Sequence, residues 1–210
     1  MLIKEFCAEN LTDLAKLDPK EVSRVELCDN LAVGGTTPSY GTIKEAAAYL
    51  HEKGITLSTM IRPRGGDFVY NSLELKVMEE DILRAVELES DGLVLGLLTS
   101  DHQLDLEGLE YLLPATQGLT LTFHRAFDRI PKNEQFQAMD HLIDLGFHRL
   151  LIHGDASDNP ISKNSEHLKK LIQHANGRIE IILAGGVTKE NCSHLSQDIK
   201  TPYVHGTKIV

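Results

Sequence analysis

Two kinds of apolar pattern alternate along the whole chain. Short, mostly apolar stretches predict strands at residues 2–9, 24–28, 56–62, 92–98, 119–124, 149–153, 178–183 and 202–205. Between them, apolar residues recur at helical spacing and predict helices at residues 11–17, 42–53, 72–89, 106–113, 133–145, 165–175 and 188–195. The clearest helix is 72–89, whose periodic apolar positions are Leu73, Val77, Ile82, Leu83 and Val86.

This regular alternation predicts a parallel sheet covered by helices. Eight strands favour a closed TIM (β/α)8 barrel over an open sheet, and the lack of Pro/Gly/Ser-rich linkers predicts one domain over residues 1–210. The last predicted strand lies so close to Val210 that we expect the barrel to lack its last helix. The outer face beside the first and last strands would then be bare, and we expect a second copy to cover it in a homodimer or higher homo-oligomer.

Composition narrows the class of protein. Of 210 residues 41% are apolar, enough for a real core, and the net charge of −10 argues against nucleic acid or an anionic membrane as partner. No apolar run is long enough to span a membrane, and the N-terminus lacks the pattern of a signal peptide. Three cysteines do not make a disulfide framework. We therefore expect a reduced, cytoplasmic protein.

Thiols and ionisable side chains gather where the predicted strands end, which is where barrels of this class carry their chemistry. Residues i and i+2 share a strand face, so Glu5 lies beside Cys7, and Glu26 beside Cys28. The first two strands are neighbours in a barrel, so two thiols and two carboxylates are expected to converge. Arg62 ends the next strand and is expected to pair with Glu26, because a buried charge needs a partner.

Cys7 and Cys28 allow two interpretations. A free cysteine often packs as a small buried apolar residue without any function. Two thiolates also suit Cu(I), a soft metal ion. Cys192 falls on a predicted helix away from the strand ends, and we expect it to be inert.

Further candidates follow the fifth, sixth and eighth strands. His124 and Asp128 could form an acid–base pair, or a histidine and an aspartate that hold a loop. Glu26 is another candidate acid–base group. His153 and His205 are either ligands or histidines whose hydrogen bonds are satisfied in the core.

Other residues suit an anion. Arg64 precedes Gly65-Gly66-Asp67 in a predicted loop, and Gly185-Gly186 leads from the seventh strand towards a helix, where backbone N–H groups can cradle phosphate. The alternatives are a solvated loop charge and an ordinary tight turn. The candidate ligand-binding residues are Arg62, Arg64, Asp67, Arg125, His153, Gly185, Gly186 and His205.

Three of these segments resemble the CutC copper-homeostasis family: 24–39 (RVELCDNLAVGGTTPS), 60–70 (MIRPRGGDFVY) and 122–128 (TFHRAFD). The resemblance runs in order from Cys7 to His205. It implies a TIM barrel, a cytoplasmic location and a role in copper handling, with Cys7 and Cys28 matching the family's strand-end cysteines. The chain departs from the pattern at 184–186 (AGG), where other members often carry three glycines, and it ends just after the eighth strand, where some members continue.

Two functions remain open at this level. The first is a cytoplasmic copper homeostasis protein that binds Cu(I) through Cys7 and Cys28. The second is a TIM-barrel enzyme that acts on a small anionic metabolite, a phosphorylated one included, with Glu26, His124 and Asp128 in acid–base roles. Arginines repel a metal cation and suit an anion, so the arginines at the strand ends keep the second function open.

Overall fold

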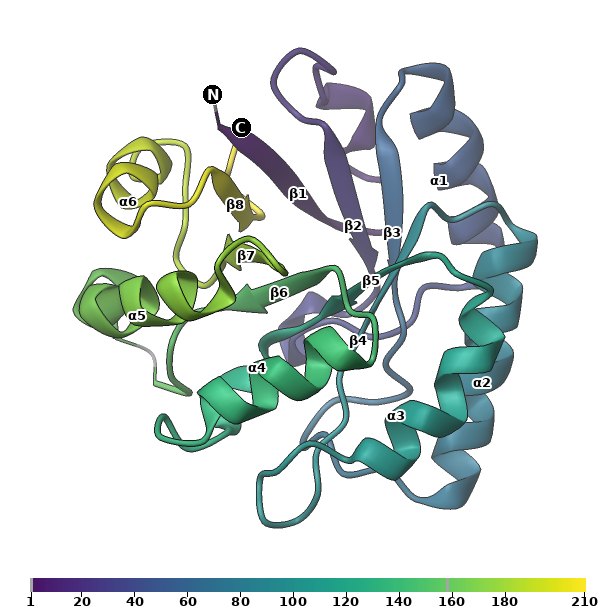
Figure 1. Cartoon of the computed structure of the whole chain (residues 1–210). Coiled ribbons are helices and arrows are strands. Elements are labelled where there is room, and N and C mark those ends of the chain that lie inside the picture. The colour runs from purple at the N-terminus through teal and green to yellow at the C-terminus, as the bar shows by residue number, and fades with distance from the viewer. Residues whose placement is uncertain (1, 158) are drawn as a thin grey trace.

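The predicted strands close into one parallel barrel. The computed structural model describes residues 2–157 and 159–210, and its strands pair in chain order, with β8 hydrogen-bonded back to β1. The strands are β1 Ile3–Glu9, β2 Arg24–Cys28, β3 Thr56–Met60, β4 Gly92–Leu95, β5 Thr120–Phe123, β6 Arg149–Ile152, β7 Glu180–Leu183 and β8 Tyr203–Gly206. Figure 1 shows the start of β1 beside the C-terminal end of the chain, where β1 meets β8. The predicted TIM barrel is confirmed.

Helices surround the barrel (Figure 1). The described residues form the α-helices α1 Tyr40–Glu52, α2 Ser72–Glu87, α3 Leu106–Leu112, α4 Gln135–Asp144, α5 Ser165–Ala175 and α6 Cys192–Ile199. The helix predicted at 11–17 is only a 3-10 turn, Leu14–Lys16. The helix predicted from residue 188 begins at Cys192 instead, because the side chain of Asn191 accepts the N–H of Thr188 and donates to the carbonyl of Gly186, which holds a turn there.

Helix α2 buries only part of its predicted apolar set. Its packing side is formed by Met78, Ile82 and Ala85, whereas Leu73 and Val77 are 71% and 49% exposed. Ile82 belongs to the predicted set and is fully buried, and Val86 packs against the core. The predicted helix is confirmed, and its periodic apolar residues are divided between the packing side and the surface.

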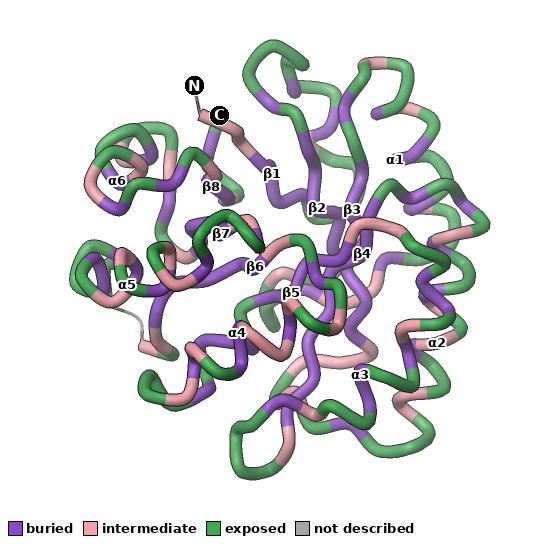
Figure 2. The backbone as a smooth tube through the Cα atoms, viewed as in Figure 1, coloured by how far each residue is buried: buried purple, intermediate pink, exposed green. Residues whose placement is uncertain are grey.

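The strand backbone is buried and the helices alternate between buried and exposed residues (Figure 2). The outer faces of the strands pack on the helices in the main core, while two small apolar clusters belong to alternate strand positions that face inward. One of them contains Cys7, Cys28, Met60 and Val94. The interior near β1 and β2 therefore combines thiols with apolar side chains.

No helix follows β8 in the described chain. Phe6 on β1, Val204 on β8 and Ile209 beyond it are nevertheless buried within the single chain. The apolar strip that motivated a homodimer is smaller than expected, and association remains a prediction that sedimentation at micromolar concentration would test. Within the described residues, no helix is long and apolar enough to cross a membrane.

Candidate functional site

Two thiols meet one buried carboxylate inside the barrel. The register of β1 and β2 places Cys7 opposite Glu26, and strand alternation brings Cys28 to the same face as Glu26. The Oε1 atom of Glu26 lies 3.9 Å from the Sγ of Cys7 and 3.4 Å from the Sγ of Cys28. The predicted convergence of these three side chains is therefore present.

His205 joins this cluster from β8. Its Nδ1 lies 2.9 Å from the Oε1 of Glu5, and its Nε2 lies 4.0 Å from the Oε1 of Glu26. The donor atoms of Cys7, Glu26 and His205 all lie within 4.8 Å of one another, and all three residues are buried. Sulfur, nitrogen and oxygen donors at this spacing form a candidate metal centre. We call Cys7, Cys28, Glu26 and His205 the thiol cluster.

An ion-pair network continues from the thiol cluster through the barrel. The Nε of Arg24 donates to Glu5 at 3.1 Å, and its Nη1 donates to Glu180 at 3.2 Å. Arg149 reaches the same oxygen of Glu180 at 3.0 Å. Sequence reasoning missed Arg24 and Glu180 as part of this site. The available signal was strand alternation, because Arg24 shares a face with Glu26 and Cys28.

The expected ion pair between Glu26 and Arg62 is not formed. Arg62 instead donates to backbone carbonyls: Nη1 binds the oxygens of Val33 and Gly35, and Nη2 binds that of Gly66, each at 2.9 Å. These bonds tie together the loops after β2 and β3. The loop carbonyls accept several N–H groups of the Arg62 guanidinium. No carboxylate has to be buried beside the arginine for this.

Arg64 and Asp67 also make ion pairs and hydrogen bonds with other residues of the protein. Arg64 pairs with Glu74 and Asp67 and donates to the carbonyl of Val69. Protein acceptors already occupy much of both guanidinium groups, so the structure does not assemble Arg62 and Arg64 into an anion clamp.

His124 and Asp128 do not hydrogen-bond to each other. The Nδ1 of His124 accepts the N–H of Ala126, which caps the turn that follows β5. Asp128 accepts Nε–H of Arg125 and the backbone N–H groups of His153 and Gly154. The predicted acid–base pair is therefore absent, since backbone donors and Arg125 hold the carboxylate. The alternative interpretation, in which both residues hold a loop, describes their contacts.

A hollow lies at the ends of β5, β6 and β7. It has a volume of about 380 Å³, and its lining includes Arg125, His153, Gly185 and Gly186. These four predicted ligand-binding residues come together, whereas His205 lies in the thiol cluster and Arg62 ties the loops. The candidate residues thus divide between two separate places in the barrel.

The model of the CutC family matches residues 2–210. The chain belongs to the CutC family. The CutC protein of Streptococcus pyogenes is 66% identical and that of Enterococcus faecalis 49% identical, each over the full length of both chains. The crystal structure of CutC from Streptococcus agalactiae is 62% identical, with a TM-score of 0.99 and full coverage of both chains.

The pKa values in the CutC thiol cluster are strongly perturbed. The contact with Cys28, and then the nearby His205, lower the pKa of Cys7 to about 5 despite burial. The same contact and burial raise the pKa of Cys28 well above its usual value, and burial raises the pKa of Glu26 to about 8. Burial opposes charge on His205, but the neighbouring Glu26, Cys7 and Glu5 raise its pKa well above the usual value. At neutral pH the cluster therefore holds one thiolate beside an imidazolium.

Several buried polar side-chain atoms have no hydrogen-bond partner among the described residues, and three of them matter for function. These three are the Oε2 of Glu26, the Oγ1 of Thr122 and the Nε2 of His124. Most buried polar groups in proteins are paired, so each such atom calls for a water or a ligand. These unpaired atoms come from β2, from β5 and from the residue that follows β5.

His124 should make the protein sensitive to acid. Burial, and then the positive charge of Arg62, lower the pKa of His124 to about 3 from its ordinary 6.5. Between these values the unfolded chain binds a proton that the folded chain does not. The free energy of unfolding therefore falls as the pH drops through this window, by up to about 1.4 kcal/mol per pH unit. When the pH is lowered from 6.5 to about 4, the free energy of unfolding should fall less in His124→Asn than in the wild type. Urea unfolding measures the difference.

The matched control is His194→Asn, which alters an exposed histidine on α6. Its stability should follow the wild-type pH dependence. Identical pH dependence for His124→Asn and the wild type would contradict the assignment of a buried neutral ring.

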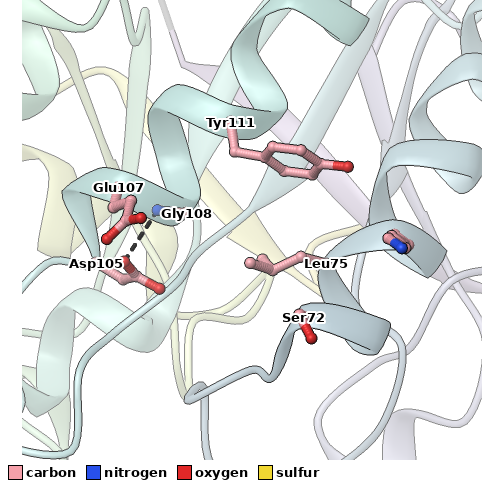
Figure 3. Close-up of a pocket in the computed structure, with 7 residues that line it drawn as sticks. Ser72, Leu75, Asp105, Glu107, Gly108 and Tyr111 are labelled. Carbon is pink, nitrogen blue, oxygen red and sulfur yellow. Dashed lines mark hydrogen bonds between the residues drawn. The ribbon is translucent and has the colours of Figure 1, made fainter.

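A second cavity, of about 360 Å³, lies outside the barrel between α2 and α3 (Figure 3). Its polar groups serve the helices: Asp105 caps α3 by accepting the N–H of Gly108, and Tyr111 donates to Glu79 across the two helices. Leu75 packs between them, as Figure 3 shows. The groups that line this cavity therefore stabilise the packing of two helices.

Proposed function

We propose that this CutC chain binds one Cu(I) ion between Cys7 and Cys28 and acts as a cytoplasmic copper homeostasis protein. The observation that carries the proposal is the contact of both thiols with the same buried oxygen of Glu26. Thiolate sulfur is the donor that soft Cu(I) selects, and two thiolates suffice for a linear site. The carboxylate of Glu26 is a hard donor and is better suited to hold a proton.

The charges around the thiol cluster favour such a complex. Cu(I) with two thiolates carries one net negative charge, which the buried imidazolium of His205 offsets. Cys7 is already a thiolate at neutral pH because of its low pKa of about 5. Cys28 must release its proton when the ion binds, so binding should release about one proton at neutral pH.

The relatives and the free thiols support this function. The similar protein from Streptococcus agalactiae is described as a candidate copper homeostasis protein. Cys7, Cys28 and Cys192 are free cysteines in this chain. A site built from two thiols needs a reducing compartment, and the cytosol provides one.

An anaerobic titration against a chromophoric Cu(I) chelator tests the proposal, with Zn(II) titrated in parallel. We expect one equivalent of tightly bound Cu(I) and weaker Zn(II). Two thiolates are the donors that soft Cu(I) selects. Glu26, with a pKa of about 8, holds a proton at neutral pH and is a poor ligand for the harder Zn(II). The absence of a stoichiometric Cu(I) site, or tighter Zn(II) than Cu(I), would contradict it.

An enzyme acting on a small anionic metabolite is the second candidate. It is favoured by the partnerless buried atoms of Glu26, Thr122 and His124, which could position a polar substrate inside the barrel. His124→Asn should then abolish the stabilisation that such a metabolite gives in a thermal-shift screen. A screen in which no anionic metabolite stabilises the wild type would count against this function.

A further inference from the structure

The hollow at the ends of β5, β6 and β7 is built from residues that the thiol cluster does not use. Its lining comprises Arg125, His153, Ser157, Asn159, Pro160, Gly185 and Gly186. The thiol cluster comes from β1, β2 and β8 instead. Any ligand of the hollow would therefore be recognised by different chemistry from that of a soft metal ion.

Arg125 presents the free edge of its guanidinium to this hollow. Its Nε donates to the Oδ2 of Asp128 at 2.9 Å, and Asp128 is itself held by the N–H groups of His153 and Gly154. Its Nη1 and Nη2 have no acceptor in the described parts of the chain. The side chain of Arg125 is 42% exposed. One edge of the guanidinium is thus anchored, and the other edge is available to a ligand.

The glycine pair lies directly against this guanidinium. A Cβ atom on Gly185 would lie 3.2 Å from the Nη1 of Arg125 and 2.9 Å from the ring of His153, so only glycine allows the backbone to approach so closely. Gly185 and Gly186 have φ angles of +84° and +76°. Their two N–H groups, and that of Val187, donate to no acceptor within residues 2–157 and 159–210. Backbone donors and a guanidinium therefore border the same hollow.

The neighbouring carboxylates within residues 2–157 and 159–210 do not cancel this positive site. Asp128 is balanced by Arg125 and two backbone donors, and Asp155 pairs with Lys132 at 3.3 Å. The chain as a whole has a net charge of −10. The hollow differs from it, because a guanidinium with free donors lies there beside unpaired N–H groups. Such a combination favours a compact anion with several oxygens over a carboxylate, which has only two.

We propose that Arg125, Gly185 and Gly186 bind the phosphate group of a small phosphorylated metabolite. The guanidinium would bind two phosphate oxygens through Nη1 and Nη2, and the glycine N–H groups would bind the third. Loops after the seventh strand frequently bind phosphate in barrels of this class, which agrees with this position. The proposal is independent of the Cu(I) site, because no residue is shared between them.

Isothermal titration in a chloride buffer tests the proposal, with glycerol 3-phosphate and inorganic phosphate as probes. We expect the ester to bind more tightly than inorganic phosphate, and Arg125→Gln to weaken its binding at least about tenfold, the effect of one lost charge-assisted hydrogen bond. Arg64→Gln is the matched control, because Arg64 is an arginine of a neighbouring loop that pairs with Glu74 and Asp67. It should bind the ester as the wild type does.

Gly186→Ala provides a second test in case Arg125→Gln fails to fold. A Cβ atom at Gly186 would meet no protein atom within 4 Å and would enter the open space of the hollow. The substitution should weaken ester binding, because the methyl group obstructs the ligand and because alanine is strained at this positive φ. Cys7→Ser should leave ester binding unchanged, which separates this site from the thiol cluster. No binding of either probe, or equal losses in Arg125→Gln and Arg64→Gln, would overturn the proposal. Equal or tighter binding of inorganic phosphate would overturn its assignment to an ester.

Discussion

Cys7→Ser should weaken Cu(I) binding by more than about 100-fold. Substitution of residues that only support the ligands of a metal costs up to about 100-fold in affinity, and the loss of a ligand should cost more. A serine hydroxyl is a hard donor that stays protonated at neutral pH, so the substitution removes the thiolate that the low pKa of Cys7 provides. Competition with a chromophoric Cu(I) chelator under anaerobic conditions measures the change. Cys28→Ser should produce a loss of similar size, and the double variant should retain no tight site.

Cys192→Ser is the control for this series. Cys192 is also a buried free cysteine, but it lies at the start of α6, where its thiol contacts the carbonyl of Lys189. Its substitution should leave Cu(I) affinity unchanged. Wild-type affinity in the Cys7→Ser variant, or an equal loss in Cys192→Ser, would show that copper does not bind at the thiol cluster.

Arg24→Met should reduce the free energy of unfolding by about 3–5 kcal/mol, because it removes the cation that bridges two carboxylates in the barrel. Glu5 is only 1% exposed, and Arg24 reaches both Glu5 and Glu180. Burial opposes the charge of Glu5, but His205 and then Arg24 hold its pKa below the usual value. Without Arg24 that carboxylate loses one of its two charged partners. Chemical unfolding of the two proteins at neutral pH measures the difference.

Arg84→Met is the matched control, since Arg84 also contacts two carboxylates, those of Glu80 and Glu87. All three side chains are exposed on α2, where ion pairs contribute little to stability. The stability of this variant should stay close to that of the wild type. Similar unfolding midpoints for Arg24→Met and Arg84→Met would contradict a structural role for the buried network.

Most of the fold could be predicted from the pattern of apolar residues. Strand β2 and helix α5 begin and end at the predicted residues, because a short apolar run and an amphipathic segment each ended in clear polar or glycine signals. The start of α6 and the exposure of Leu73 and Val77 on α2 could not be predicted. The first depends on hydrogen bonds of Asn191, and the second depends on which side of the helix packs against the barrel.

The thiol cluster was predictable in part. Cys7, Glu26 and Cys28 converge because strand alternation and the pairing of two consecutive strands are both readable in the sequence. The contact of His205 with Glu5 needs β8 to close on β1, which places residues 200 positions apart in register. The role of Arg62 could not be predicted from the sequence. Its acceptors are loop carbonyls, and no pattern of side chains encodes where these carbonyls lie.

X-ray absorption at the copper edge of the protein loaded anaerobically with one equivalent of Cu(I) tests the central claim most directly. The spectrum should show a low-coordinate Cu(I) ion with two sulfur neighbours, and both sulfur contributions should disappear in the Cys7→Ser/Cys28→Ser variant. A wild-type spectrum with only nitrogen or oxygen neighbours, or one that the double substitution leaves unchanged, would show that the thiol cluster is not the copper site.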